Sequence, residues 1–199
     1  MMWTEFNLMI NFYPTQDSAF DQAEYDAYKE EASQNGVPME LLEWRQAKYQ
    51  MLWFPKYMQR SNKQKPEVVF GISPQGNLQN CLNMGADVQT WCSTQGYIDY
   101  ICPQLYVNFE HQVLPFGSAV KEWRDLVTNP SIKLYFGLGL YKAGSDVDGG
   151  TWQKSDTIIA DQIQAGREAQ GDGFMFYSYD YLNHEQTEQE VQNAVKLLN

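Results

Sequence analysis

Polar and aromatic side chains follow several short apolar segments of this sequence, at the points where buried strands would end. One such segment, YIDYICPQLY, begins with tyrosine and isoleucine and ends with Gln104 and Tyr106. Ser73, Lys142 and Tyr179 follow three other apolar segments. Amide, hydroxyl, ammonium and aromatic groups together suit a polyhydroxylated ligand better than a phosphate or a hydrophobic ligand. We therefore predict that these five side chains contact such a ligand.

Most of these side chains also have an ordinary structural role open to them. Gln104 can satisfy the backbone of a loop, and Lys142 can form a salt bridge with a neighbouring strand end. Tyr106 and Tyr179 can simply pack against their neighbours. Only the arrangement of the strand ends in space can separate these roles from ligand binding.

The segments that would position these residues alternate between strand-like and helix-like patterns. Each strand-like run is short and apolar on both faces, as in a parallel sheet covered by helices. We expect strands at residues 6–12, 68–72, 98–106, 134–141 and 174–179. We expect helices at residues 19–33, 39–60, 86–94, 118–127, 155–168 and 185–198. This order predicts an α/β protein with a parallel sheet and right-handed crossovers.

Two parallel architectures fit this order, an open doubly wound sheet and part of a (β/α)8 barrel of the TIM type. An open nucleotide-binding sheet usually carries a glycine-rich turn after its first strand, and the sequence has no such turn. In a barrel, the functional groups collect at the C-terminal ends of the strands. Because Gln104, Tyr106 and Lys142 follow that rule, we favour the partial barrel with outer helices.

The composition argues against several classes of function. The 199 residues carry a formal net charge of −11, which disfavours binding to nucleic acid and to anionic membranes. Three cysteines and two histidines lack a metal-binding spacing, so we expect no metal. The sequence gives no sign of an organic cofactor, and we expect none. We expect His111 and His184 in solvent-facing loops. No apolar run is long enough to predict a membrane span, and the first ten residues do not have the pattern of a signal peptide.

Four segments at the expected strand ends resemble the glycosyl hydrolase-like 10 family. They are FGISPQGN (70–77), ADVQTWCSTQGYIDYICPQLY (86–106), KLYFGLGLYK (133–142) and DGFMFYSYDYL (172–182). The resemblance extends over residues 11–199. It implies a (β/α)8 barrel that acts on glycans of the bacterial envelope, with peptidoglycan strands as the expected substrate. It also implies a secreted or envelope-bound protein.

The sequence departs from the family pattern in its N-terminal part. The matching region resembles the second half of the barrel, so we expect a single domain over residues 1–199 with about five strands. In the family, the strand before the FYP motif ends in two aspartates, and Met9 and Ile10 stand at those positions here. Lys48 stands where an asparagine is expected, and Pro55 interrupts a helix that is usually continuous. We therefore expect a truncated barrel.

Glu110 and Asp180 are the carboxylates that we select as the candidate catalytic pair. Hydrolysis of a glycosidic bond usually requires two carboxyl groups, one as acid and one as base or nucleophile. With the two family aspartates replaced, these residues remain near strand ends. The alternatives are a solvated loop charge for Glu110 and a hydrogen bond to the last loop for Asp180. Asp17 is expected to cap a helix.

A partial barrel leaves two sheet edges without a neighbouring strand, and such edges favour self-association. Three functional readings stay open for such a chain. It is a hydrolase of envelope glycans, a glycan-binding module that has lost its acid pair, or a fragment without a function of its own. The first two predict a glycan as the partner.

Overall fold

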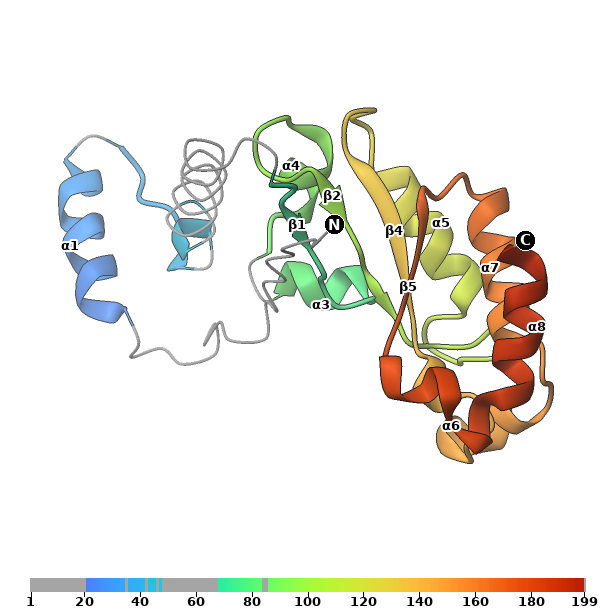
Figure 1. Ribbon diagram of the computed structural model, residues 1–199. Coiled ribbons are helices and arrows are strands. Elements are labelled where there is room, and N and C mark those ends of the chain that lie inside the picture. Colours follow the sequence, from blue (N-terminus) through green and yellow to red (C-terminus); the bar gives the residue numbers. More distant parts are fainter. Residues whose placement is uncertain are drawn as a thin grey trace.

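The computed structural model describes residues 21–34, 36–41, 43–45, 47, 68–83 and 86–198 (Figure 1). Several expectations concern residues outside this part of the chain: the strand at 6–12, most of the helix at 39–60, Met9, Ile10, Asp17, Lys48 and Pro55. The described residues form a five-stranded sheet. Its strands are β1 (Gly71–Ile72), β2 (Tyr100–Ile101), β3 (Gln104–Leu105), β4 (Lys133–Leu138) and β5 (Gly173–Phe176).

The strands follow one another across the sheet in the order of the chain. β1 pairs with β2, β2 with β4 and β4 with β5, and every pairing is parallel. β3 follows β2 after Pro103 and pairs with the second half of β4, where Gln104 lies opposite Gly137. The expected strand at 98–106 is thus divided, because Pro103 has no N–H to donate to the ladder. This order is that of a barrel wall, since the order of a doubly wound sheet reverses.

Helices connect these strands and cover the sheet. The longer helices are α1 (Gln22–Ser33), α5 (Phe116–Leu126), α7 (Ile158–Glu168) and α8 (Glu188–Leu198). The shorter ones are α3 (Leu78–Asn83), α4 (Val88–Ser93) and α6 (Val147–Gly150). Single 3-10 turns are η1 (Leu140–Lys142), η2 (Thr151–Gln153), η3 (Tyr179–Asn183) and η4 (Glu185–Thr187). Figure 1 shows α5 and α7 on one side of β4, and α8 packs against α7. The prediction of a parallel α/β fold is confirmed.

The core lies between the sheet and these helices. In β4, Leu134, Phe136 and Leu138 are fully buried. They share one face because side chains alternate along a strand. α5 turns an apolar stripe toward them, with Phe116 and Trp123 fully buried at its two ends. This packing holds the sheet against the helices. A ligand site can then form from the loops that follow the strands.

The opposite face of the sheet carries tyrosine rings over glycines. The rings of Tyr100 and Tyr135 meet edge to face, with centroids 5.4 Å apart. A Cβ on Gly71 would lie 2.2 Å from the ring of Tyr100, and a Cβ on Gly173 would lie 3.0 Å from the ring of Tyr135. Glycine is therefore required at residue 71, because the ring of Tyr100 in β2 lies across β1 at this position.

Two aspartates hold the N-terminal ends of the strands in the same way. The carboxylate of Asp99 accepts a hydrogen bond from the backbone N–H of Phe70 at 2.7 Å, and its own N–H donates to the oxygen of Phe70. Asp172 repeats this exchange with Leu134, at 2.9 Å to the carboxylate. Both aspartates lie at the N-terminal ends of the strands, and residues at this face of a barrel usually contribute to stability and not to catalysis.

We expect Asp99→Ala to lower the free energy of unfolding by about 1–3 kcal/mol, because the N–H of Phe70 loses its acceptor. Asp99→Asn keeps a carbonyl oxygen and should lose less. Asp125→Ala, at an exposed ion pair on α5, is the control and should cost less than about 0.5 kcal/mol. Urea unfolding at pH 7 measures all three. Equal losses for Asp99→Ala and Asp125→Ala would contradict this role.

Candidate functional site

A cavity of about 340 Å³ lies at the C-terminal ends of β1 and β3. Four side-chain amides, one imidazole, one phenol and several aliphatic groups form its wall. The lining residues are Gln75, Gly76, Asn77, Asn80, Gln104, Leu105, Tyr106, Val107, His111, Val113 and Leu114. None of these described residues is Asp, Glu, Lys or Arg. The position is the one at which barrel proteins bind their ligands.

Gln104 ties the loop after β1 to β3. Its Nε2 donates to the backbone oxygen of Ser73 at 3.0 Å, so two of the predicted site residues are in contact. Ser73 is buried and takes part through its backbone. Gly76 permits the close approach, because a Cβ there would lie 2.4 Å from the oxygen of Gln104. The Oε1 atom of Gln104 has no partner among the described residues and is available to a ligand.

Three tyrosines that follow β3, β4 and β5 form an aromatic cluster. The ring of Tyr106 stacks on that of Tyr177 with centroids 5.4 Å apart, and Tyr141 meets both rings edge-on at 5.9 Å. Tyr177 is 53% exposed, so much of this stack is open to a flat ligand such as a sugar ring. Burial raises the pKa of Tyr106, and its phenol therefore stays protonated and can donate a hydrogen bond.

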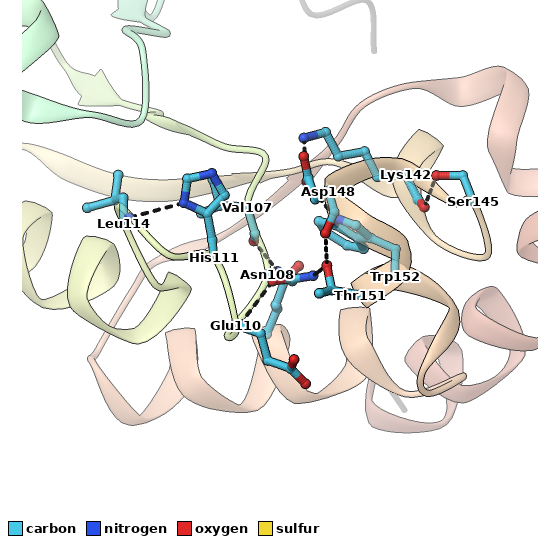
Figure 2. A network of polar contacts seen from close by, with 11 residues as sticks. Val107, Asn108, Glu110, His111, Leu114, Lys142, Ser145, Asp148, Thr151 and Trp152 are labelled. Atoms are coloured by element: carbon cyan, nitrogen blue, oxygen red, sulfur yellow. Dashed lines mark hydrogen bonds and ion pairs between the residues drawn. The ribbon is translucent and has the colours of Figure 1, made fainter.

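A polar network joins the loops after β3 and β4 (Figure 2). Asn108 is buried and donates to the hydroxyl of Thr151, which donates to the backbone oxygen of Asp148. The Oδ2 atom of Asp148 accepts from Trp152 Nε1 at 2.8 Å and from Lys142 Nζ at 3.0 Å. Glu110 joins the network through its backbone N–H, which donates to Asn108 Oδ1 at 3.0 Å. Lys142 and Glu110 were predicted as site residues, whereas Asn108, Asp148, Thr151 and Trp152 were not.

The salt bridge between Lys142 and Asp148 limits the roles that are open to Lys142. Burial alone would raise the pKa of Asp148, but hydrogen bonds from Trp152 and Lys142 outweigh it and the charge of His111 adds to them. The pKa of Asp148 is therefore below its usual value, and the carboxylate compensates the charge of Lys142. The predicted alternative for Lys142 was a salt bridge to a neighbouring strand end, whereas its partner Asp148 lies in α6, in the loop that follows its own strand.

His111 lies at the cavity and not in a purely solvent-facing loop as expected. Its Nδ1 accepts a hydrogen bond from the N–H of Leu114 at 3.0 Å. In the neutral ring the proton is then on Nε2, which can donate to a ligand. The sequence feature that could have placed His111 at the cavity is its position, six residues after the end of β3.

The two candidate carboxylates lie outside the cavity wall. Glu110 Oε2 lies 2.5 Å from Lys154 Nζ, and both side chains are 56% exposed. Asp180 is exposed in η3, next to Tyr179, which is 77% exposed. No hydrogen bond joins Glu110 to Asp180 within the described ranges. Their role as an acid pair stays a prediction.

Within the described residues, the cysteines and the other potential metal ligands do not form a second site. Cys81, Cys92 and Cys102 are buried without disulfides, and burial raises the pKa of Cys81 to about 11 and that of Cys92 to about 12. Across the described residues, no cluster of three His, Cys, Asp or Glu could hold a metal ion. No helix in this part of the chain has the length and apolarity for a membrane crossing.

The fold and the site together define a class of protein. Parallel strands in chain order, with polar and aromatic side chains at their C-terminal ends, are the arrangement of (β/α)8-barrel proteins. The chain belongs to the glycosyl hydrolase-like 10 family, whose profile matches residues 8–154. Three of the four family-like segments lie inside this match, and the segment at 172–182 lies beyond it.

The relatives carry the same kind of name. The chain is 30% identical over 173 residues to "Glycosyl hydrolase DigH" of Escherichia coli O6:H1, a match that covers 75% of this chain and 38% of that protein. It is 28% identical over 180 residues to "Glycosyl hydrolase YngK" of Bacillus subtilis, which covers 82% of this chain and 34% of the relative. The chain therefore spans less than half the length of these relatives.

Proposed function

We propose that this chain forms part of a glycoside hydrolase that acts on bacterial envelope glycans, with peptidoglycan glycan strands as the substrate. The observation that carries the proposal is the amide-lined cavity beside the tyrosine cluster at the strand ends. Amides satisfy sugar hydroxyls, and aromatic rings pack against the apolar face of a sugar. Family membership supports the same reaction class.

In this proposal each predicted site residue has a defined task. Gln104 accepts a hydrogen bond from the ligand while Ser73 holds it in place through the backbone. Tyr106 binds a sugar ring, and the exposed Tyr179 offers a further aromatic ring in the segment after β5. Lys142 orients Asp148 and, through it, the loop after β4.

Glu110 and Asp180 supply the acid and the base or nucleophile in this proposal. Such pairs stand roughly 5–10 Å apart around the scissile bond. The loops after β3 and β5 carry them, so a glycan that crosses the strand ends would pass both loops.

Glu110→Gln and Asp180→Asn should each lower turnover by about 10²–10⁴-fold if they form this pair, because each removes a proton-transfer group. Release of soluble fragments from purified sacculi measures turnover. Glu168→Gln and Asp125→Asn, at exposed positions on α7 and α5, make the same chemical changes and should leave turnover unchanged. Full turnover in both candidate variants would remove them as the catalytic pair.

A second function, glycan binding without hydrolysis, is favoured by one observation: the described cavity lining contains no carboxylate. The same sacculi distinguish the two functions. Retention of the chain on sacculi without release of fragments would support the binding module. Release of fragments supports the hydrolase.

The proposed substrate also bears on location and assembly. We propose that the protein acts in the cell envelope or outside the cell, because its substrate lies there. β1 and β5 are the outer strands of the described sheet, and self-association through these edges stays a proposal.

A further inference from the structure

We propose that the cavity at the ends of β1 and β3 is a subsite for an uncharged N-acetylhexosamine, and that it rejects a sugar with a free carboxylate. The inference rests on the proposed function, since it assumes that a glycan crosses the strand ends. It adds which sugar of the glycan enters this cavity.

The free polar atoms of the cavity match an acetamido sugar. Asn77 Oδ1 accepts from the N–H of Asn80, which leaves Asn77 Nδ2 as a donor. Asn80 Oδ1 and Gln104 Oε1 are acceptors, and His111 Nε2 is a further donor in the neutral ring. None of these four atoms has a partner among the described residues. An acetamido group needs both an acceptor for its N–H and a donor for its carbonyl, and hydroxyls use either.

One wall of the cavity is apolar and accessible. Val113 is 79% exposed and Leu114 is 9% exposed, and both line the cavity beside Tyr106. A methyl group of an acetamido substituent can pack against aliphatic side chains of this kind, whereas a plain hydroxyl gains nothing there. The wall therefore favours an N-acetylated sugar over an unsubstituted one.

The charges explain the rejection of a carboxylate. The described lining contains no lysine or arginine, and the neighbouring Lys142 is compensated by Asp148 at 3.0 Å. The chain as a whole carries a net charge of −11. With the ring of His111 neutral, a sugar carboxylate in the cavity would give up water without gaining a cation, which is unfavourable.

This selectivity would set the register of a glycan in which uncharged and carboxylate-bearing sugars alternate. Only the uncharged N-acetylhexosamine enters the cavity, so its acidic neighbours lie on either side. Such discrimination is a difference between two affinities, and the unpaired carboxylate supplies the repulsive part.

Calorimetric titration of the full chain at pH 8 tests the inference with three trisaccharides. Chitotriose is uncharged and N-acetylated, cellotriose lacks the acetamido groups, and trigalacturonate carries a carboxylate on each sugar. We expect chitotriose to bind about tenfold or more tightly than trigalacturonate, and several-fold more tightly than cellotriose.

Two pairs of variants locate the binding. Val113→Lys should reduce the preference for chitotriose over trigalacturonate by about tenfold, because it supplies the missing cation. Val37→Lys makes the same change at a side chain that is 95% exposed outside the cavity lining and should alter nothing. Asn80→Ala should weaken chitotriose binding several-fold, whereas Gln79→Ala, at the neighbouring exposed position, should not.

The outcomes separate this inference from the proposed function. Equal affinities for chitotriose and trigalacturonate overturn the subsite, as does an equal response to Val113→Lys and Val37→Lys. If sacculi are nevertheless cleaved, the proposed function stands without the subsite. If no saccharide binds and sacculi are neither bound nor cleaved, both proposals fail.

Discussion

Trp123→Ala is expected to lower the free energy of unfolding by about 3–5 kcal/mol. Trp123 lies on the face of α5 that packs against the sheet, and its side chain is 0% exposed. Its Nε1 donates to the backbone oxygen of Gly76 at 2.8 Å. The substitution therefore removes a large buried ring and a hydrogen bond to the cavity wall at once. Urea unfolding followed by circular dichroism measures the loss.

Trp123→Phe separates the hydrogen bond from the packing. The oxygen of Gly76 would lose its donor in a buried position, at a cost of about 1–3 kcal/mol. We also expect faster amide hydrogen exchange around Gly76, because the loop loses its anchor to α5.

Phe116→Leu is the matched control for Trp123→Phe. Phe116 is fully buried on the same helix and packs against Phe109 with ring centroids 5.3 Å apart. The variant should cost about 1 kcal/mol without a local effect on exchange at Gly76. If both variants leave exchange at Gly76 unchanged, the tryptophan acts through packing alone.

The parallel sheet could be predicted because its strands are short and apolar at most positions on both faces. Runs such as KLYFGL are apolar at nearly every position, and this pattern is typical of parallel strands covered by helices. The same reasoning brought Gln104, Tyr106 and Ser73 to one region, because the C-terminal ends of parallel strands share one edge. The break at Pro103 was not predicted, because residues 98–106 were expected to form a single strand, although a proline cannot donate to the ladder.

The contacts between loops could not be predicted in the same way. Asn108 and Thr151 lie in different loops, and no periodic pattern relates them. Lys142 and Asp148 are close in sequence, but no pattern in the five residues between them predicts that the two side chains pair or that Trp152 donates to the same carboxylate. His111 was assigned to solvent because a lone histidine in a polar segment has no pattern of its own.

The aromatic cluster shows the same limit at the level of single residues. The sequence places tyrosines after β3, β4 and β5, which is enough to predict that some of them meet. It does not say that Tyr177, and not Tyr179, stacks on Tyr106. That choice depends on the backbone of one turn after β5.

The second large expected effect is a dependence of the free energy of unfolding on pH, and Glu190 is the residue that causes it. This residue of α8 is 2% exposed, and its carboxylate accepts the N–H groups of Ile158 and Ile159 at 3.0 Å each. It thereby caps the N-terminus of α7 and joins the two helices. Burial raises the pKa of Glu190 to about 7, the two N–H groups oppose this rise, and the charges of Asp156 and Asp161 add to it.

The raised pKa of Glu190 determines whether stability rises or falls with pH. An unfolded chain releases the proton of a glutamate near pH 4.5, whereas the folded protein holds that of Glu190 up to about pH 7. Its contribution to stability is therefore complete below pH 4.5 and is lost as the pH rises through 7. A difference of this size corresponds to about 3 kcal/mol. In Glu190→Gln the side chain no longer titrates, so this contribution disappears. The free energy of unfolding of the wild type minus that of the variant should be about 3 kcal/mol larger at pH 4.5 than at pH 8.

Glu188→Gln, at an exposed position on the same helix, is the control and should show a nearly constant difference. Urea unfolding at pH 4.5, 6 and 8 provides the values. A constant difference for Glu190→Gln as well would mean that the carboxylate is ionised throughout this range and that the two N–H groups, not burial, dominate its pKa.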